Sequence, residues 1–224
     1  MSVPEAAAAL GSDERSVRSM AARGEIDAIK RGGAWWIDGR SVDRRRRQQP
    51  GRGRPLSPVM AWAVLLVASG ADPAAVARGD YQARRAREWV AGHPLADSAA
   101  ALRRRARREA FDIHFSELPR IAAREDLSPT GISAAADVGL RGGGDDLELY
   151  APAGGRDSIV ADHALEPGDG PLLIRWMPDD LWAAVRAAVS PRSRVAPRAA
   201  VLVDLLEHDD PRARREAARA LSHA

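Results

Sequence analysis

The beginning of the chain alternates between apolar and polar positions with the period of an α-helix. Ser2 and Glu5 form a capping box, which predicts a first helix over about residues 4–10. Ser12 is placed to cap a second helix that runs to about Arg23. The apolar positions of this second helix have the i, i+3, i+4 spacing of a buried face: Val17, Met20 and Ala21. The pattern therefore predicts two short helices joined by a tight turn, which is a helix-turn-helix.

Two short strand-like runs follow the second helix, over residues 26–29 and 34–37. The segment between them consists of Lys30, Arg31, Gly32 and Gly33. The runs predict a β-hairpin with a basic, glycine-rich tip. Such a tip approaches a phosphate backbone closely, because glycine removes side-chain bulk and the cations supply charge. Trp35 and Trp36 are consecutive and face opposite sides of the hairpin, and the pattern leaves open which of them is buried.

Residues 59–110 have the pattern of a helical segment. The run 59–68 is apolar on all sides, which predicts a buried helix. Asp72 followed by a proline predicts the start of a second helix over about residues 74–91. Its candidate core residues are Val76, Tyr81 and Trp89. A third helix is expected to start near Asp97 and to continue through an arginine run.

The arginine run contains five cations, namely Arg103, Arg104, Arg105, Arg107 and Arg108. Two interpretations are open: a second nucleic-acid surface, and a solvated or partner-facing helix. On a helix these arginines sweep around most of the circumference, and Glu109 is adjacent to them. The spread favours the solvated or partner-facing helix.

From residue 112 onward, short strands and helices alternate and are separated by glycine and proline turns. The predicted strands span residues 147–151 and 171–177. The predicted helices span residues 118–127 and 157–165, and a third begins at Asp179 and Asp180. Two amphipathic helices are expected at the end of the chain. The three glycines at 142–144 are interpreted as a turn, because they lack the spacing of a phosphate-binding loop.

These elements predict a helix-rich, multi-domain α/β protein. We expect a winged helix-turn-helix domain at 1–47, an Arg/Pro/Gly linker at 48–58, a helical segment at 59–111 and an α/β domain at 112–224 that ends in two helices. The arginines of the linker leave two interpretations open, a solvated tether and a basic arm that follows the DNA backbone or a minor groove.

The distribution of charge points to the beginning of the chain. Residues 1–54 hold 12 Lys and Arg against 7 Asp and Glu, whereas residues 55–224 hold 22 against 24. The excess of arginine over lysine is by itself no sign of nucleic-acid binding, because GC-rich genomes favour it. The location of the excess is informative, and it places a positive field on the predicted helix-turn-helix.

Composition narrows the classes of function. The chain has 224 residues and is 45% hydrophobic, so it can bury a sizeable core. It has no cysteine, which excludes disulfides, thiolate nucleophiles and cysteine-based zinc sites. The longest apolar run is too short to span a bilayer, and no signal peptide is visible. We expect a soluble cytoplasmic protein that does not bind membranes.

The first module resembles the excisionase-type, MerR-related family of winged helix-turn-helix proteins. The matching sequence is VPEAAAALG…ERSVRSMAARGEIDAIKRGGAWWIDGRSVDR. The resemblance implies binding to double-stranded DNA, with the second helix as recognition helix and the hairpin as a wing. The same module serves excisionases, transcriptional regulators and antitoxins. The candidate DNA-contacting residues are Ser12, Arg15, Ser16, Arg18, Ser19, Arg23, Lys30, Arg31, Gly32, Gly33 and Arg40.

The end of the chain is similar to the C-terminal domain of the AbiE-type abortive-infection antitoxins. The likeness rests on the order of the elements LELYAPA, DSIVADHALEP and PLLIRWMPDD, followed by VAPRAAVLVDLLEHDDPRARREAARAL. It implies an autorepressor whose C-terminal domain antagonises a nucleotidyltransferase toxin. The chain departs from that pattern in its excisionase-like module and in the helical segment at 59–111.

Catalysis has little support in the sequence. The five histidines lack the spacing of a metal site, and no serine-nucleophile motif accompanies them. They are interpreted as surface or helix-end residues: His93, His114, His163, His208 and His223. We therefore predict no enzyme activity, no metal and no cofactor.

The sequence predicts a sequence-specific DNA-binding transcriptional regulator, and the favoured role is the antitoxin-like autorepressor of a toxin–antitoxin operon. One such module reads only a few base pairs, so we expect a homo-oligomer or cooperative binding. The possible protein partner is a cognate toxin of the nucleotidyltransferase type. Two alternatives remain: an excisionase-like factor that bends DNA, and a nucleic-acid enzyme that uses the module for targeting.

Overall fold

A computed structural model describes residues 1–48, 54–142, 146–189 and 193–222 of this helix-rich α/β protein, except for the side chains of residues 43, 44 and 46–48. The chain divides into two compact units, Met1–Gly53 and Arg54–Ala224, and each is described by itself. Residues 49–53 of the expected linker and 143–144 of the expected glycine turn lie outside the described residues.

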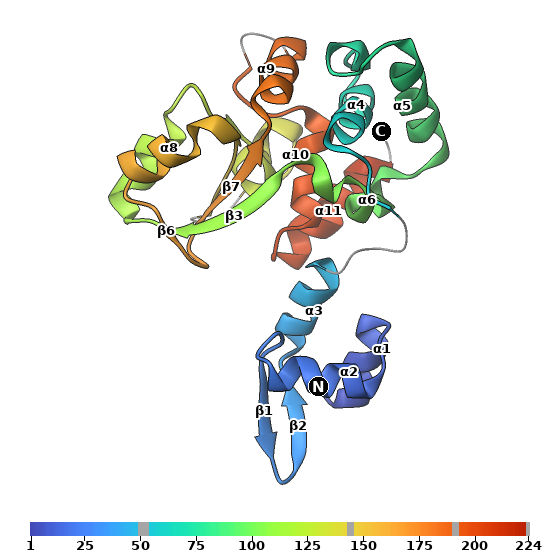
Figure 1. Ribbon diagram of the computed structural model, residues 1–224, viewed down its shortest axis with the longest axis vertical. Coiled ribbons are helices and arrows are strands. Elements are labelled where there is room, and N and C mark those ends of the chain that lie inside the picture. The colour runs from blue at the N-terminus through green and yellow to red at the C-terminus, as the bar shows by residue number, and fades with distance from the viewer. Residues whose placement is uncertain (49–53, 143–145, 190–192, 223–224) are drawn as a thin grey trace. The chain divides into compact units, whose positions relative to one another are not determined.

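The N-terminal unit contains three helices and one hairpin in its described part (Figure 1). The helices are α1 (Val3–Leu10), α2 (Glu14–Ala22) and α3 (Gly39–Gln48), and the strands are β1 (Ala28–Arg31) and β2 (Ala34–Ile37). The predicted capping box is confirmed, because the Ser2 and Glu5 side chains each bond the backbone N–H of the other residue. The unit has its own core, which joins both helices of the helix-turn-helix to the hairpin and α3: Val3, Ala6, Ala7, Leu10, Val17, Met20, Ala21, Ile26, Ile37 and Val42.

The cap of α2 differs from the prediction. Asp13, and not Ser12, accepts the hydrogen bond from the backbone N–H of Ser16. Ser12 belongs to the turn that ends α1: Gly11 is left-handed at φ 59°, and the Ser12 N–H donates to the Ala7 carbonyl at 3.0 Å. This six-residue closure follows the Schellman motif and moves the start of α2 by one residue.

The hairpin is tighter than its sequence suggested. Gly32 and Gly33 form a two-residue turn with φ values of 57° and 79°, the combination that a type I′ turn requires. Lys30 and Arg31, which were expected at the tip, therefore belong to β1. Trp36 is 55% exposed on the hairpin's outer face, as the alternation of strand residues requires if its neighbour Trp35 packs on the core.

The C-terminal unit is built on a mixed five-stranded sheet with the order β4-β5-β7-β3-β6 (Figure 1). Its strands are β3 (Arg107–Asp112), β4 (Ser128–Pro129), β5 (Leu147–Pro152), β6 (Glu166–Pro167) and β7 (Leu172–Met177). β5 and β7 pair in parallel, and the other pairs are antiparallel. The two strands that the sequence predicted, β5 and β7, lie side by side, and β7 is the central strand.

Helices cover both faces of this sheet. One face packs on α7 (Leu118–Ala122) and α8 (Arg156–Asp162) through a core that includes Phe111, Leu149 and Ile174. On the other face, Tyr150 and Met177 belong to a core shared with α4 (Pro58–Ala68), α9 (Asp179–Ala188), α10 (Arg198–Leu206) and α11 (Pro211–Ser222), of which α11 packs on α10. The buried helix at 59–68 and the two C-terminal helices are thereby confirmed, whereas the helices expected at 118–127 and 157–165 are shorter than predicted.

The helix expected over residues 74–91 begins later. Asp72 caps a short 3-10 turn at Pro73–Ala75, and α5 spans Asp80–Gly92. Gly79 interrupts the helical backbone with a φ of 91°. Tyr81 is consequently 61% exposed, so its assignment to the core was wrong, whereas Val76 is buried.

The interpretation of the arginine run as a solvated helix is also wrong. A short helix, α6 (Ala99–Leu102), leads into a 3-10 turn at Arg103–Arg105 and then into strand β3. β3 pairs with β7 along its length, with Arg108 opposite Arg175. Arg105 is 1% exposed. The segment expected to be wholly helical therefore supplies a strand of the sheet and shares one core with α10 and α11.

Candidate nucleic-acid interface and a buried charge network

The exposed side of α2 carries the residues predicted to contact DNA. Val17, Met20 and Ala21 are buried, so the intervening positions face away from the core. Arg15, Arg18 and Ser19 recur at i, i+3, i+4 and lie on one face. Asp13 and Glu14 at the start of the helix complement its positive end. The helix is therefore held from its buried side and its cap, and its polar face is available for a ligand.

The residues of this face that were predicted to contact DNA differ in the contacts that they make with other residues of the chain. Within the described part of the chain, Arg15 is exposed and its guanidinium has no hydrogen-bond or ion-pair partner. Arg18 instead pairs with Glu14 at 2.5 Å. The hydroxyl of Ser16 donates to Asp13, and that of Ser19 accepts from Arg23. Arg15 is thus the basic side chain of this face that can bind an anion without first breaking an ion pair.

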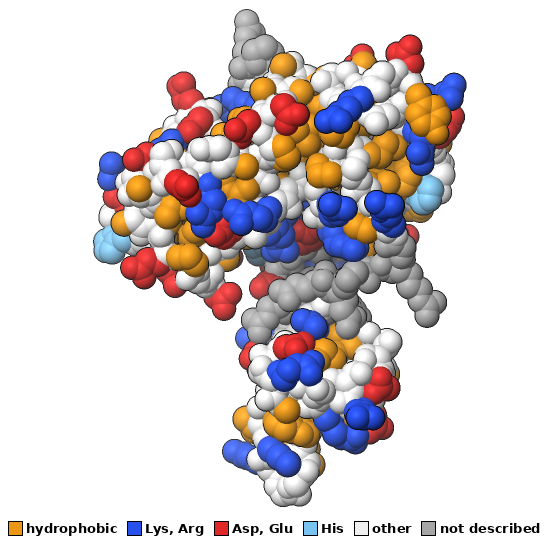
Figure 2. Space-filling model, viewed as in Figure 1, with side chains coloured by type: hydrophobic (Ala, Val, Ile, Leu, Met, Phe, Trp, Pro, Cys, Tyr) orange, Lys and Arg blue, Asp and Glu red, His pale blue; other side chains and the backbone are white. Residues whose placement is uncertain are grey.

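The hairpin and the start of α3 add further cations. The Lys30 ammonium lies over the Trp35 ring, 5.8 Å from its centroid. Arg31 and Arg40 are exposed, and neither guanidinium pairs with a carboxylate among the described residues. In Figure 2 basic and hydrophobic side chains lie next to each other toward the hairpin end of the unit, while the tip shows neither kind. The bare tip corresponds to Gly32 and Gly33, which leave its backbone accessible.

The carboxylates of this unit are engaged by its own residues. Hydrogen bonds from the Ser16 N–H and hydroxyl lower the pKa of Asp13. The Arg23 guanidinium lowers the pKa of Glu25, which also pairs with Arg45 at 2.9 Å. Arg23 is therefore committed to Glu25 and Ser19 rather than free for a phosphate. Eight of the eleven residues predicted for DNA contact fall into two groups. The cations without a carboxylate partner among the described residues are Arg15, Lys30, Arg31 and Arg40, and the paired side chains are Ser16, Arg18, Ser19 and Arg23. The other three, Ser12, Gly32 and Gly33, belong to turns.

Residues 1–50 match the family model described as a helix-turn-helix domain. The match covers nearly all of the N-terminal unit and supports its interpretation as a helix-turn-helix DNA-binding module. No curated protein and no solved structure matches the chain. None of the helices in the described ranges is long and apolar enough to cross a membrane.

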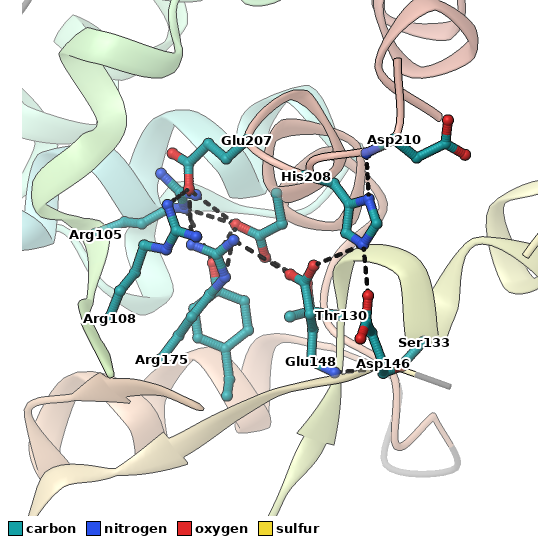
Figure 3. A network of polar contacts seen from close by, with 12 residues as sticks. Arg105, Arg108, Thr130, Ser133, Asp146, Glu148, Arg175, Glu207, His208 and Asp210 are labelled. Atoms are coloured by element: carbon teal, nitrogen blue, oxygen red, sulfur yellow. Dashed lines mark hydrogen bonds and ion pairs between the residues drawn. The ribbon is translucent and has the colours of Figure 1, made fainter. Parts of the chain in front are cut away.

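The C-terminal unit holds a second polar feature, which the sequence analysis did not identify (Figure 3). Charged side chains lie between the sheet and α10, and we call them the buried charge network: Arg105, Glu148, Arg175, Asp204 and Glu207. Asp204 is fully buried and accepts hydrogen bonds from Arg105 Nε at 2.9 Å, Tyr150 Oη at 3.1 Å and the Thr130 hydroxyl. Glu207 pairs with Arg105 and Arg175, each at 2.8 Å.

Strand alternation explains why these side chains meet. Arg175 pairs in register with Tyr150 of β5 and with Arg108 of β3, so the three side chains form a row across the sheet on the side of α10. The sequence contained a signal for this row: Arg175 interrupts the apolar run of β7, and Asp204 interrupts that of α10. A charge within a run that must be buried requires a buried partner of opposite sign.

Burial and the neighbouring arginines shift the pKa values of the buried carboxyl groups in opposite directions. Burial raises the pKa of Glu148, and the nearby Arg175 offsets this only in part. Burial also opposes the ionisation of Glu207, but Arg105, Arg175 and Arg108 outweigh it and lower its pKa to about 2. His208 lies at the edge of the network, with its Nε2 atom 3.6 Å from Oδ2 of Asp146 and 3.8 Å from Oε1 of Glu148.

The network is a structural connection rather than a ligand site. Its charged groups pair with one another and tie β5, β7 and the turn before β3 to α10, although Arg175 Nε has no hydrogen-bond partner among the described residues. The described residues contain no group of three or more His, Asp or Glu side chains that could hold a metal ion. The histidines at 163 and 208 lie at helix ends, as predicted, but His163 is buried and contacts Glu117 at 3.1 Å rather than lying on the surface.

A glycine next to the network provides a test of its packing. A Cβ on Gly131, whose φ is +52°, would lie 2.3 Å from Oε2 of Glu148. Gly131→Ala is expected to lower the free energy of unfolding by about 2–4 kcal/mol, because it combines a left-handed backbone with a clash against a buried carboxylate. Gly139→Ala is the matched control, since Gly139 has a φ of +80° and a Cβ there would meet no described atom within 4 Å. Urea denaturation measures the free energy of unfolding of both variants. An equal loss in Gly131→Ala and Gly139→Ala would show that the Glu148 carboxylate moves away from the added methyl group at no cost.

The lowered pKa of Glu207 predicts the acid sensitivity of the C-terminal unit. A carboxylate whose folded pKa is about 2, against an ordinary value of 4.5, stabilises the fold above the ordinary value and loses that contribution as the pH falls toward the folded value. The shift corresponds to roughly 3 kcal/mol. Glu207→Gln is expected to be less stable than wild type near neutrality, and the two should converge on acidification in urea denaturation. The matched control is Glu216→Gln, which removes a partly exposed pair with Arg212. Parallel curves for Glu207→Gln and wild type would contradict the assignment.

Proposed function

We propose that the protein is a sequence-specific transcriptional regulator that binds duplex DNA through its N-terminal unit. The main support for this proposal is a set of cations on α2, the hairpin and the start of α3. They have no carboxylate partner among the described residues: Arg15, Lys30, Arg31 and Arg40. They lie on a module that matches a helix-turn-helix domain. Cations without a carboxylate partner can contact an external polyanion without first breaking an ion pair, and phosphate contacts supply much of the affinity for DNA.

The proposed complex follows from the arrangement of the unit. α2 lies in the major groove as the recognition helix, with Arg15 closest to the base edges. The hairpin acts as a wing, and the backbone amides of Gly32 and Gly33 approach the flanking phosphates together with Lys30 and Arg31. Arg18 and Arg23 contribute only if DNA phosphates replace Glu14 and Glu25 as their partners.

We further propose that the regulator is an autorepressor of the antitoxin type, located in the cytoplasm. The C-terminal unit supports a role beyond DNA binding, because it has two hydrophobic cores of its own and is far larger than a DNA-bending module requires. Its proposed partner is a nucleotidyltransferase-type toxin. Two copies, or cooperative binding to repeated sites, supply the remaining base contacts. The proposal assigns the chain no catalytic step, metal or cofactor.

The test is selection of duplexes from a random-sequence library by the purified full-length protein, followed by mobility shift at several salt concentrations. Enrichment of one motif, also present in the protein's own promoter, supports the autorepressor. Binding without enrichment indicates an architectural DNA-bending factor, which a neighbouring integrase gene would support. Retention of no duplex at any salt concentration contradicts the proposal as a whole. A nucleotidyltransferase gene next to this one, and a stable complex of the two purified products, test the antitoxin role.

A further inference from the structure

The outer face of the hairpin is apolar and is left uncovered by the described residues of its unit. Ile29 and Trp36 are directly opposite each other in the register of β1 and β2. They are 56% and 55% exposed, so two large apolar side chains lie next to each other on the surface of the hairpin. Such an exposed apolar patch is more informative than a single exposed apolar residue. Ala34 and Arg31 lie on the same face, because strand residues alternate.

The support behind this face is rigid. On the other side of the hairpin, Trp35 packs on the core and Ile37 is buried. The backbone of β2 is also fixed from the chain start: the amino group of Met1 donates to the Ile37 carbonyl at 2.7 Å, and the Ile37 N–H donates to the Met1 carbonyl at 2.9 Å. Trp36 is thus an exposed aromatic ring on a strand that is held in place from its buried side.

The charge around this face indicates what it binds. No residue from 28 to 37 is acidic, and Arg31 lies on the same face as the apolar pair, whereas Lys30 lies on the opposite face over the Trp35 ring. A protein surface that places apolar side chains beside a cation, with no carboxylate near them, complements a polyanion that has apolar walls. Duplex DNA has that character in its minor groove, where deoxyribose and base edges lie between two rows of phosphates.

We infer that Trp36 and Ile29 form an apolar wedge that enters the minor groove of the bound duplex and bends it. The inference rests on the proposed function, because it requires α2 to occupy the major groove. The hairpin projects from the same unit beyond the helices (Figure 1), so it reaches over the backbone into the adjoining minor groove. Apolar side chains inserted there unstack a base step and kink the duplex toward the major groove.

The experiment compares bending and affinity in variants of the full-length protein. The probe is a duplex selected by the wild-type protein from a random-sequence library, labelled at its two ends for energy transfer. Trp36→Ala is expected to abolish most of the bend and to raise Kd about tenfold, the size typical of a lost aromatic contact with nucleic acid. Trp36→Phe, which keeps an apolar ring, should retain most of the bend. The matched control is Phe115→Ala, which removes an exposed aromatic ring (63%) from the other unit and should change neither quantity.

A second readout locates the contact itself. Protein labelled with 5-fluorotryptophan gives a fluorine signal for Trp36, identified by its absence in Trp36→Phe. That signal should shift on addition of the selected duplex and should not depend on protein concentration without DNA. A shift with protein concentration alone would assign the face to contact between copies of the chain and overturn the wedge. Unchanged bending in Trp36→Ala overturns it as well, while leaving the proposed function intact if wild type binds. Failure of wild type to select any duplex removes the proposed function and the wedge together.

Discussion

Asp204→Ala is expected to lower the free energy of unfolding by about 3–5 kcal/mol, the range found when one partner of a buried ion pair is removed. Asp204 is fully buried and holds Arg105, Tyr150 and Thr130 by hydrogen bonds. Without it, the positive charges of Arg105 and Arg175 remain in the interior with fewer counter-charges. Urea denaturation followed by far-ultraviolet circular dichroism measures the loss.

Two further variants separate charge from packing in this experiment. Asp204→Asn keeps the shape of the side chain and part of its hydrogen bonding, so its effect should lie between those of wild type and Asp204→Ala. Glu88→Ala removes a pair with Arg84 at 3.6 Å in which both side chains are about two-thirds exposed, and it should change stability by less than about 1 kcal/mol. A loss in Asp204→Ala no larger than in Glu88→Ala would mean that water replaces Asp204 around both arginines.

The N-terminal unit shows how far local sequence signals reach. The capping box, the glycine turn and the period of the buried positions each act within a few residues, and each predicts its element correctly at α1 and α2. The errors there are small shifts: the cap of α2 lies one residue later than predicted, and β1 begins two residues later. Ser12 is used by the turn that ends α1, and the tight Gly32–Gly33 turn leaves Lys30 and Arg31 to the strand.

The C-terminal unit shows where local signals fail. The arginine run has no local property that excludes a helix, and only its pairing with β7, more than sixty residues away, makes residues 107–112 a strand. The role of Arg105 depends on Asp204, whose separation from it in sequence is 99 residues. A single charged residue within an apolar run predicts a buried partner of opposite charge. Which residue that partner is depends on the order of the strands in the sheet, and composition and spacing do not determine that order.

The same limit applies to the DNA interface. The sequence identifies the charged residues of α2 and the hairpin but does not distinguish free side chains from paired ones. The structure makes that distinction within its described part: Arg18 and Arg23 face carboxylates, whereas Arg15, Lys30, Arg31 and Arg40 do not. Exposure of Trp36 was likewise undetermined, since alternation fixes only that two consecutive residues differ.

Replacing the four free cations of the N-terminal unit together, as Arg15→Ala, Lys30→Ala, Arg31→Ala and Arg40→Ala, is expected to weaken binding to the selected duplex roughly a thousandfold at moderate salt. Each lost phosphate contact should also reduce the slope of log Kd against log salt by about 0.9. Arg15→Ala alone should cost about 1–3 kcal/mol and relax the preference for one base position, because Arg15 lies on the recognition helix. Lys30→Ala and Arg31→Ala should weaken all sequences alike. Mobility shift across a salt series measures both quantities.

The matched control removes the same net charge from the other unit. Arg78, Arg198, Arg215 and Arg219 are exposed, and their guanidinium groups have no carboxylate partner in the ranges that the structure describes. Their joint replacement by alanine changes the long-range field of the protein as much as the first variant does, but it should leave the slope nearly unchanged. If both variants lose affinity equally, net charge and not a defined interface accounts for binding. If only the first does, the unpaired cations of the helix-turn-helix unit contact the duplex, because a contact releases counter-ions and a distant charge does not.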